Sequence, residues 1–247
     1  MLGKYRQGKN KLYILKKEDI DIEAENILRE YCPNCLDEPK EVNIEKLIED
    51  MGLILSYACI SKNSEVLGAF VFNEGIIPTF NDGQEYQKKY SAKTIIIDTK
   101  IAEEDDPRLR FTYGHELGHY VTQFDIYHIN EHQYFLDLFN DYKEVDNAVI
   151  CKRETVLNFN TKNKLETKED WQEWQANYFS SCILIPKSTL KMLLKPYIDN
   201  YDVMDSNNVL DKLERTELKK LINKLSSIYN VSKEMMVNRL KSLGYLK

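Results

Sequence analysis

The chain has 247 residues, of which 43% are hydrophobic and 30% are charged, and its formal net charge is -6. This length allows one large domain or one domain with a small appendage, and the acidic balance excludes a nucleic-acid binder whose whole surface is basic. The N-terminus has no apolar run of signal-peptide length, and no later stretch reaches the roughly 18 apolar residues of a membrane helix, so we expect a cytoplasmic protein.

The N-terminal part changes from helical to strand-like periodicity. Apolar residues recur at helical spacing over 16–32, and a second helix is predicted over 43–52, with Asn43 as its cap. Three β-rich runs follow, at 53–60, 66–72 and 93–99. Turn-like stretches such as 80–85 separate them, and we predict one mostly antiparallel sheet.

Cysteine usage favours reduced thiols. There are five cysteines, and Cys32 and Cys35 form a single C-x-x-C pair. An odd number without framework spacing is typical of a protein that keeps its thiols reduced, and a zinc knuckle would need a second pair. We therefore expect two thiols in a loop that follows a helix.

Helices return after the predicted strands. Region 103–124 is predicted to be helical, because Asp106 can cap it and Pro107 suits the first helical position. A long mixed segment follows, at about 126–168, and segments of that length often cover a site. The next helix is predicted over 168–185, with a start that resembles a capping box.

The first of these two helices contains the motif His-Glu-Leu-Gly-His. Residues four apart share a helix face, so His115 and His119 can converge on one metal ion. Glu116 lies beside that face, where it could take a proton from water without being a ligand. Two structural histidines would show the same spacing, but their placement on a well-started helix behind a strand favours the metal site.

A tetrahedral catalytic site needs a third protein ligand, and the sequence offers three sources for it. Asp125 lies ten residues after His115, as does the last ligand in another class of zinc peptidases, but the glycine that turns the chain in that class is absent. His128 and His132 lie beyond the expected end of the helix. The third source is Glu173.

Glu173 lies on the second helix, on one face with Ala176, Asn177 and Ser180. Small residues beside a carboxylate allow a helix to approach another helix closely. Gly118, which has no side chain, is a matching position on the first helix. The spacing favours this glutamate, although a solvated glutamate would show the same pattern. Asn177 could orient a metal-bound histidine.

Two stretches together match the motifs of one family. RFTYGHELGHY, at 110–120, has the pattern R-F-T-x-x-H-E-x-G-H, and EWQANYFSSCILIP, at 173–186, follows E-x-x-A-[DN]-x-F-A-x-x-L-L-x-P. The chain thus resembles the ImmA/IrrE family of cytoplasmic zinc-dependent metallopeptidases. Ser180 and Ile185 replace an alanine and a frequent methionine. The 53 residues between His119 and Glu173 exceed the spacing in compact members, so the resemblance does not show how the cleft is covered.

This resemblance implies that His115, His119 and Glu173 hold zinc, with manganese possible, and that Glu116 is the catalytic base. It implies an endopeptidase that cuts a transcriptional repressor of the helix-turn-helix class and so releases genes of mobile elements or stress responses. An oxyanion donor is also expected, and the sequence does not choose among its candidates. These are Tyr113, Tyr120, Tyr142 and His128.

We therefore predict an α+β fold in which a small, mostly antiparallel sheet packs against helices that carry the metal ligands. Residues 1–198 would form a zincin-like metallopeptidase domain, with 126–168 as its covering segment, and 199–247 would form a helical, helix-turn-helix-like tail. From Leu210 onward the tail has nine Lys or Arg against four Asp or Glu. It could contact DNA or a DNA-binding partner, but we favour a helical pair packed on the peptidase domain.

Two other functions compete with the peptidase. One is a DNA-associated regulator with a structural or vestigial metal site, which should bind duplex DNA with strong salt dependence. The other is a metal-dependent amidase of small molecules, which would not cleave a folded repressor.

Overall fold

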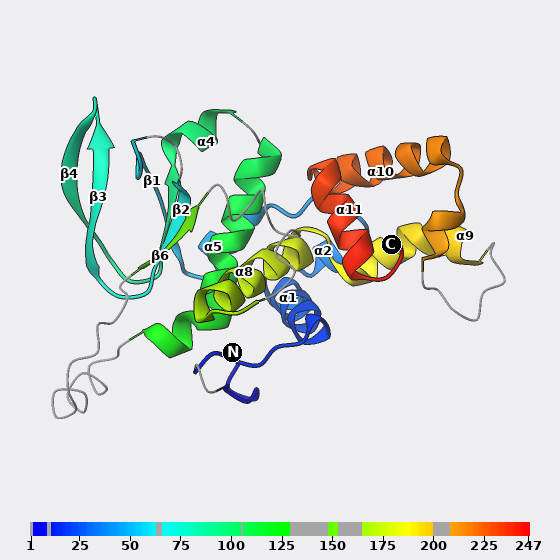
Figure 1. Ribbon diagram of the computed structural model, residues 1–247, viewed down its shortest axis with the longest axis horizontal. Coiled ribbons are helices and arrows are strands. Elements are labelled where there is room, and N and C mark those ends of the chain that lie inside the picture. Colours follow the sequence, from blue (N-terminus) through cyan, green and yellow to red (C-terminus); the bar gives the residue numbers. More distant parts are fainter. Residues whose placement is uncertain are drawn as a thin grey trace.

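The computed structural model describes residues 2–8, 11–62, 66–104, 106–128, 148–152, 165–199 and 208–247. A sheet and a hairpin lie at one end of the molecule, two long helices occupy the middle, and the C-terminal helices lie at the other end (Figure 1). The predicted α+β class, with a small sheet packed against helices, is confirmed.

The main sheet has four strands in the order β1-β5-β2-β6. These strands are β1 (Ile54–Ala58), β2 (Val66–Val71), β5 (Thr94–Asp98) and β6 (Ala148–Lys152). Strand β1 pairs with β5 in parallel, whereas β2 pairs antiparallel with both β5 and β6. The three predicted strands are therefore present, in a sheet that is mostly antiparallel.

Two further strands form a hairpin that the sequence did not indicate. They are β3 (Gly75–Asn81) and β4 (Gln84–Tyr90), which pair antiparallel. Asp82 and Gly83 connect them with positive φ angles of 47° and 77°, as a tight two-residue hairpin turn requires. The turn at 80–85 was expected, but β4 is polar and exposed along most of its length, so it shows no alternation between apolar and polar residues.

Strand β6 lies within the long mixed segment at about 126–168. Residues 148–152 form an edge strand of the main sheet, paired with β2. Short strands with ordinary composition are hard to recognise within a long mixed segment. Residues 129–147 and 153–164 lie outside the described residues, so a cover over the site stays a prediction.

The four predicted N-terminal and central helices are present: α1 (Lys17–Tyr31), α3 (Ile44–Asp50), α5 (Asp106–Tyr127) and α8 (Lys168–Leu184). The side chain of Asn43 accepts a hydrogen bond from the Lys46 backbone, as expected of a cap. Thr167 and Asp170 form the expected capping box of α8. Asp106 is itself the first helical residue of α5, one position later than a cap. A short helix, α4 (Thr99–Glu104), precedes it.

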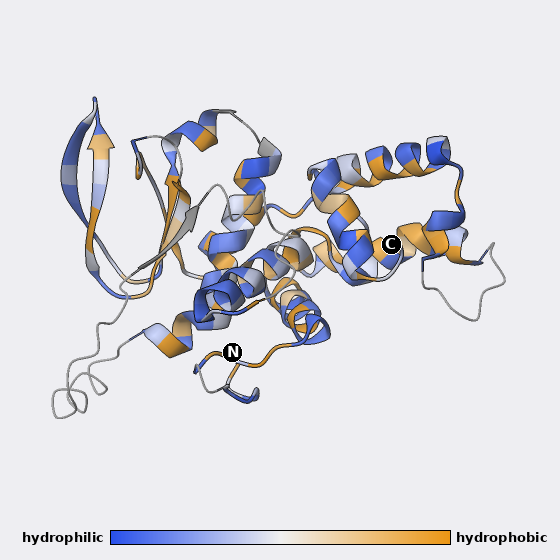
Figure 2. Ribbon diagram, in the orientation of Figure 1, coloured by the Kyte–Doolittle hydropathy of each residue, from blue (hydrophilic) through white to orange (hydrophobic). Residues whose placement is uncertain are grey.

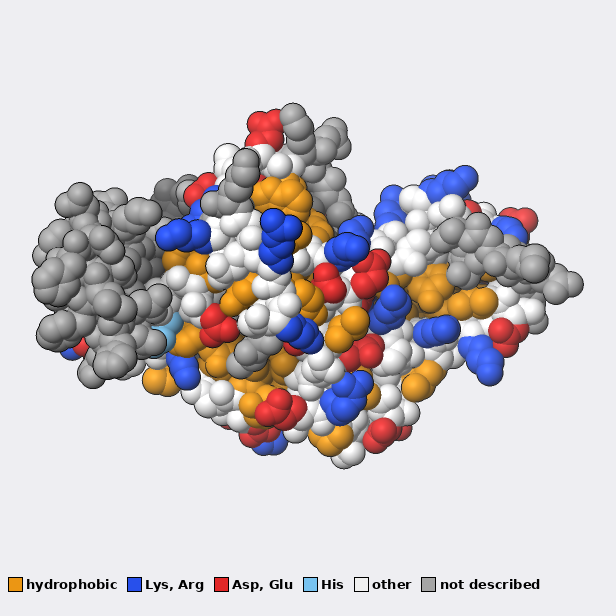
Figure 3. All heavy atoms as spheres, turned by 90° about the horizontal axis from the view of Figure 1, so that it is seen from below, with side chains coloured by type: hydrophobic (Ala, Val, Ile, Leu, Met, Phe, Trp, Pro, Cys, Tyr) orange, Lys and Arg blue, Asp and Glu red, His pale blue; other side chains and the backbone are white. Residues whose placement is uncertain are grey.

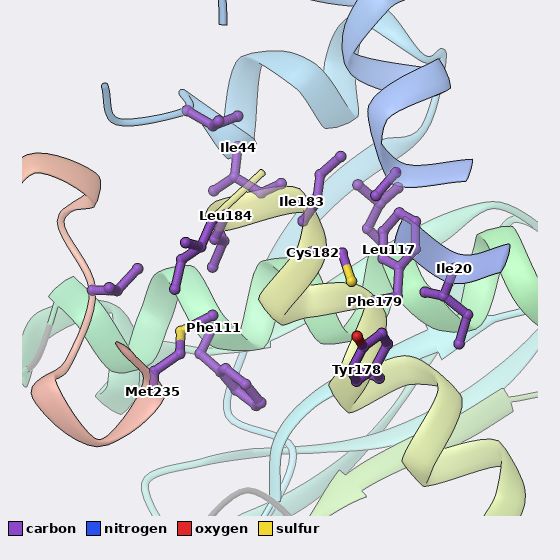
Figure 4. Packing of buried hydrophobic residues seen from close by; sticks show 14 of the residues in the cluster. Ile20, Ile44, Phe111, Leu117, Tyr178, Phe179, Cys182, Ile183, Leu184 and Met235 are labelled. Atoms are coloured by element: carbon purple, nitrogen blue, oxygen red, sulfur yellow. The ribbon is translucent and has the colours of Figure 1, made fainter. Parts of the chain in front are cut away.

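Helices α5 and α8 make the most extensive contact between elements in the described part of the chain. Apolar side chains from both helices pack with residues of α1, α3 and the C-terminal region in one core (Figure 4). Leu117 of α5 and Phe179 of α8 are both fully buried there. This core fixes the two helices that carry the candidate site.

The C-terminal region is helical, with α9 (Lys187–Asp199), a 3-10 turn η1 (Val209–Lys212), α10 (Arg215–Tyr229) and α11 (Lys233–Ser242). Ser232 caps α11, as predicted, by accepting a hydrogen bond from the Met235 backbone. Helix α10 is hydrophilic along one side and hydrophobic along the other (Figure 2). A domain boundary at residue 199 stays a prediction.

A buried ion pair attaches this region to the N-terminal part. Arg239 of α11 is 1% exposed, and its guanidinium lies 2.5 Å from Oδ1 of Asp21 in α1. It also donates to the backbone oxygen of Ile185, at the end of α8. Helix α11 is therefore packed on the helices of the core.

The expectation of reduced thiols is wrong for the C-x-x-C pair. Cys32 and Cys35 are joined by a disulfide, and Cys35 lies in a one-turn helix, α2 (Asn34–Asp37), rather than in a loop. Composition cannot anticipate this bond, because it depends on how the chain turns after α1. Cys59 and Cys182 are free thiols.

The surface of the described part is mixed in charge. On the face shown in Figure 3, Lys and Arg side chains are interspersed with Asp and Glu. Among the described helices, none combines the length and the hydropathy that crossing a bilayer would require.

Candidate metal centre

The motif histidines lie one turn apart on α5 and point to the same place. His115 and His119 are both fully buried, and their Nε2 atoms are 2.9 Å apart. This follows from their spacing of four residues, which places both side chains on one helix face. The fold buries that face against α8.

Glu173 of α8 completes the group. Its carboxylate oxygens lie 3.4 Å from Nε2 of His115 and 3.5 Å from Nε2 of His119. Ligands bonded tetrahedrally to zinc at about 2.0–2.1 Å would be separated by about 3.3 Å. One donor atom from each of the three residues lies within 4.8 Å of the others, so the group could hold one metal ion.

Small residues allow α5 and α8 to approach at this point. A Cβ atom added to Gly118 would lie 2.8 Å from the backbone of Ala176, and one added to Gly114 would lie 2.5 Å from Oγ of Ser180. Real Cβ atoms do not come this close, so glycine is required at both positions for this helix spacing. The predicted close approach of the two helices at Gly118 is confirmed.

Both histidines have a side-chain amide at their second nitrogen. Oδ1 of Asn177 lies 2.9 Å from Nδ1 of His115, and Oε1 of Gln123 lies 2.9 Å from Nδ1 of His119. An amide oxygen can only accept, so each ring donates from Nδ1, and a neutral ring then has its lone pair on Nε2. Burial, with a smaller contribution from His115, lowers the pKa of His119 to about 4, which keeps this ring neutral.

Glu116 lies on the side of the site that faces strand β2. A Cβ atom on Gly68 of β2 would be 2.8 Å from its Oε1. Both carboxylate oxygens are buried, and neither has a hydrogen-bond partner among the described residues. Burial raises the pKa of Glu116 to about 8; His115 opposes this rise and Glu173 adds to it. A divalent cation nearby would lower the pKa again.

The donor set fits a divalent metal. The two Nε2 atoms lie 2.9 Å apart beside the Glu173 carboxylate, and a cation at their common point would be attracted to all three groups. Two neutral imidazoles and one carboxylate form a set typical of zinc peptidases, and it also accepts manganese.

Comparison with known families adds independent support. The family model Peptidase_M78, described as the IrrE N-terminal-like domain, matches residues 149–241. These residues, fewer than half of the chain, are similar to that peptidase domain. The match contains Glu173 and all of α8, whereas the histidine motif precedes it, so the family assignment and the His-Glu-Leu-Gly-His motif are separate observations. A search of curated proteins found no match.

The other predicted ligands lie elsewhere. Asp125 is exposed, and His128 stacks on Phe124 while its Nδ1 lies 2.8 Å from the backbone oxygen of Phe72. His132 lies outside the described residues. Of the three sources for the third ligand, the described structure brings Glu173 to the histidines.

Two of the oxyanion candidates, Tyr113 and Tyr120, contact the sheet and the core. The hydroxyl of Tyr113 lies 2.6 Å from that of Tyr57 in β1, and Tyr120 packs against Phe70 and Phe124. Tyr142 lies outside the described residues. The described contacts of the two visible tyrosines are thus with the core and the sheet.

Sequence reasoning missed three residues around the candidate metal centre: Gln123, Gln172 and Gly68. Gln123 follows His119 by four residues, so the spacing rule that revealed the histidines could have found it. Gln172 and Gly68 approach the site only because α8 and β2 pack against α5. No local sequence pattern predicts that packing.

Proposed function

We propose that this chain is a zinc-dependent endopeptidase that cuts a peptide bond in a helix-turn-helix transcriptional repressor. The observation that carries the catalytic part is the convergence of two imidazoles and a carboxylate beside Glu116, a buried acid without a hydrogen-bond partner in the described structure.

His115, His119 and Glu173 would hold the metal in this proposal. A zinc ion bound there supplies a Lewis acid, which lowers the pKa of water to about 7 and polarises the scissile carbonyl. Asn177 keeps the lone pair of His115 directed at the site through the contact at Nδ1.

Glu116 would act as the general base and then as the general acid. Its carboxylate takes a proton from the attacking water and passes it to the leaving amine, so no covalent intermediate with the enzyme is needed. Because neither oxygen is engaged by another described group, both are available for this transfer.

The substrate class is supported by the resemblance to repressor-cleaving peptidases, and it implies a cytoplasmic location. Direct contact of the tail with DNA is not needed for this function.

The first test is metal content by mass spectrometry on untagged protein. Wild type should contain about one zinc or manganese per chain, and Glu173→Ala should lose it. Glu169→Ala is the matched control, since Glu169 is an exposed glutamate one turn earlier on α8. A wild type that stays empty in excess metal would favour the DNA-associated regulator. Full retention in Glu173→Ala would return the third ligand to Asp125 or His128.

The second test addresses the substrate. Purified helix-turn-helix repressors encoded beside the gene are incubated with zinc-loaded wild type or with Glu116→Gln, and fragments are identified by mass spectrometry. Cleavage by wild type alone is expected. Intact repressors, together with turnover of small amides, would replace the repressor proposal with the amidase.

A further inference from the structure

Gln123 of α5 is a buried amide in contact with the candidate metal centre. It lies one turn after His119, is fully buried, and places Oε1 2.9 Å from Nδ1 of that ring. A buried amide is costly unless its donor and acceptor groups are both satisfied. The identity of its other partner therefore decides what Gln123 can do to the histidine.

That partner is the backbone of α8. Nε2 of Gln123 donates to the carbonyl oxygen of Gln172 at 3.1 Å. If the amide were turned over, its oxygen would face this carbonyl oxygen, and two acceptors would repel. The amide orientation is thus fixed by the backbone, and Oε1 must face His119.

The side chain of Gln172 also contacts the amide of Gln123. Its Nε2 donates to the hydroxyl of Tyr127 at 2.8 Å and lies 3.4 Å from Oε1 of Gln123. Gln172 is 6% exposed and directly precedes Glu173 in the chain. The same residue that fixes the Gln123 amide therefore neighbours the carboxylate of the site.

The fixed amide determines the tautomer of His119. Because Oε1 accepts, Nδ1 of the ring must carry the hydrogen, and Nε2 must carry the lone pair that points to His115 and Glu173. An imidazole with a hydrogen on Nε2 could not bind a metal through that atom. Gln123 thus selects the form of the ring that can act as a ligand.

We infer that Gln123, held by the backbone of Gln172, is the positioning residue of His119 and keeps it as the Nδ1–H tautomer before any metal binds. This inference rests on the proposed metal function. Residues that orient a ligand in this way typically contribute about 10–100-fold in metal affinity. We expect the loss of Gln123 to have an effect of that size.

The test compares Gln123→Met with Gln175→Met. Gln175 is also a buried glutamine, and its Nε2 donates to the backbone oxygen of Tyr13 at 2.8 Å, so both variants lose an amide bonded to a carbonyl. Zinc affinity is measured by competition with a chromophoric chelator. Gln123→Met should bind zinc about 10–100-fold more weakly, and Gln175→Met should bind as wild type does. Equal affinities in the two variants would overturn the inference.

A second readout needs no metal, and wild type alone can decide it. The ¹⁵N shifts of His119 in metal-free wild type report its tautomer, and we expect the hydrogen on Nδ1, with a mixture of tautomers in Gln123→Met. A hydrogen on Nε2 in wild type would overturn the inference by itself. Failure of wild type to bind zinc would instead reject the proposed function, while the tautomer measurement would still decide the role of Gln123.

Discussion

Helix α8 separates two buried polar clusters that differ in how well their members are satisfied. Toward α5 it presents Glu173 and Asn177, which contribute to the metal-site cluster together with the motif residues 115–119. On its other side, Tyr178 and Cys182 belong to the ion-pair cluster, which also contains Asp21 and Arg239.

The ion-pair cluster is saturated with hydrogen bonds. Arg239 donates to Asp21, to the hydroxyl of Tyr178, to the sulfur of Cys182 and to the backbone of Ile185. Asp21 in turn accepts from Tyr178 and Cys182 as well. Such a network holds α1, α8 and α11 together and leaves no described group for a ligand.

The metal-site cluster has the opposite character. Glu116 has two buried oxygens without a partner in the described structure, and the Nε2 atoms of the two histidines lie 2.9 Å apart beside a carboxylate. A fold does not gain stability from such an arrangement, so its presence indicates a group that arrives from solution. Buried charge alone does not identify a functional site, whereas buried charge without partners does.

The largest expected effect is on catalysis. Glu116→Gln should keep the metal and lose about 10²–10⁴-fold of the peptidase activity, because an amide cannot take the proton of water. Metal content and cleavage of the repressor would be measured on the same preparation. Undiminished turnover in this variant would remove the role of Glu116.

The ion-pair cluster should respond in stability instead. Arg239→Met leaves Asp21 buried without its cation, which should lower the free energy of unfolding by about 3–5 kcal/mol in urea denaturation. Arg215→Met, an exposed arginine on α10, is the control and should change it by at most about 0.5 kcal/mol. A cost below about 1 kcal/mol for Arg239→Met would contradict the structural role of this pair.

The difference between the clusters also explains what could be predicted from the sequence. His115, His119 and Glu116 lie within five residues, so helical spacing alone reveals them. Glu173 needed a second cue, the small residues around it, because its partner helix is distant in the chain. The three apolar strands and the capped helices were likewise predicted from local patterns.

What could not be predicted depends on contacts distant in the chain. The ion pair joins residues 21 and 239, and nothing in either neighbourhood marks an arginine that will be buried. Strand β6 is defined by pairing with β2, and the polar strand β4 is recognisable only beside β3. Local periodicity carries no information about such partners.

Zinc itself should stabilise the protein through one cluster only. With free zinc at 100 times its Kd, wild type should gain about 2.7 kcal/mol in the free energy of unfolding, and Glu173→Ala should gain far less. Arg239→Met should gain nearly the wild-type increment, because the two clusters lie on different sides of α8 and share no hydrogen bond in the described structure. Thermal unfolding with and without zinc measures all three increments. A much smaller gain in Arg239→Met would mean that the clusters are coupled.

The smallest expected effect concerns the close approach of α5 and α8 at Gly118. Gly118→Ala gains about 1 kcal/mol in helix propensity but overpacks a tight contact, which costs about 1–3 kcal/mol. Since the new Cβ would meet backbone atoms of Ala176, which cannot rotate away, we expect a net loss of stability and a weaker zinc affinity as α8 moves from α5. Adding Ala176→Gly should not restore either quantity, because the close atoms belong to the backbone. Restoration in the double variant would show that a side chain, not the backbone, sets the spacing of the helices.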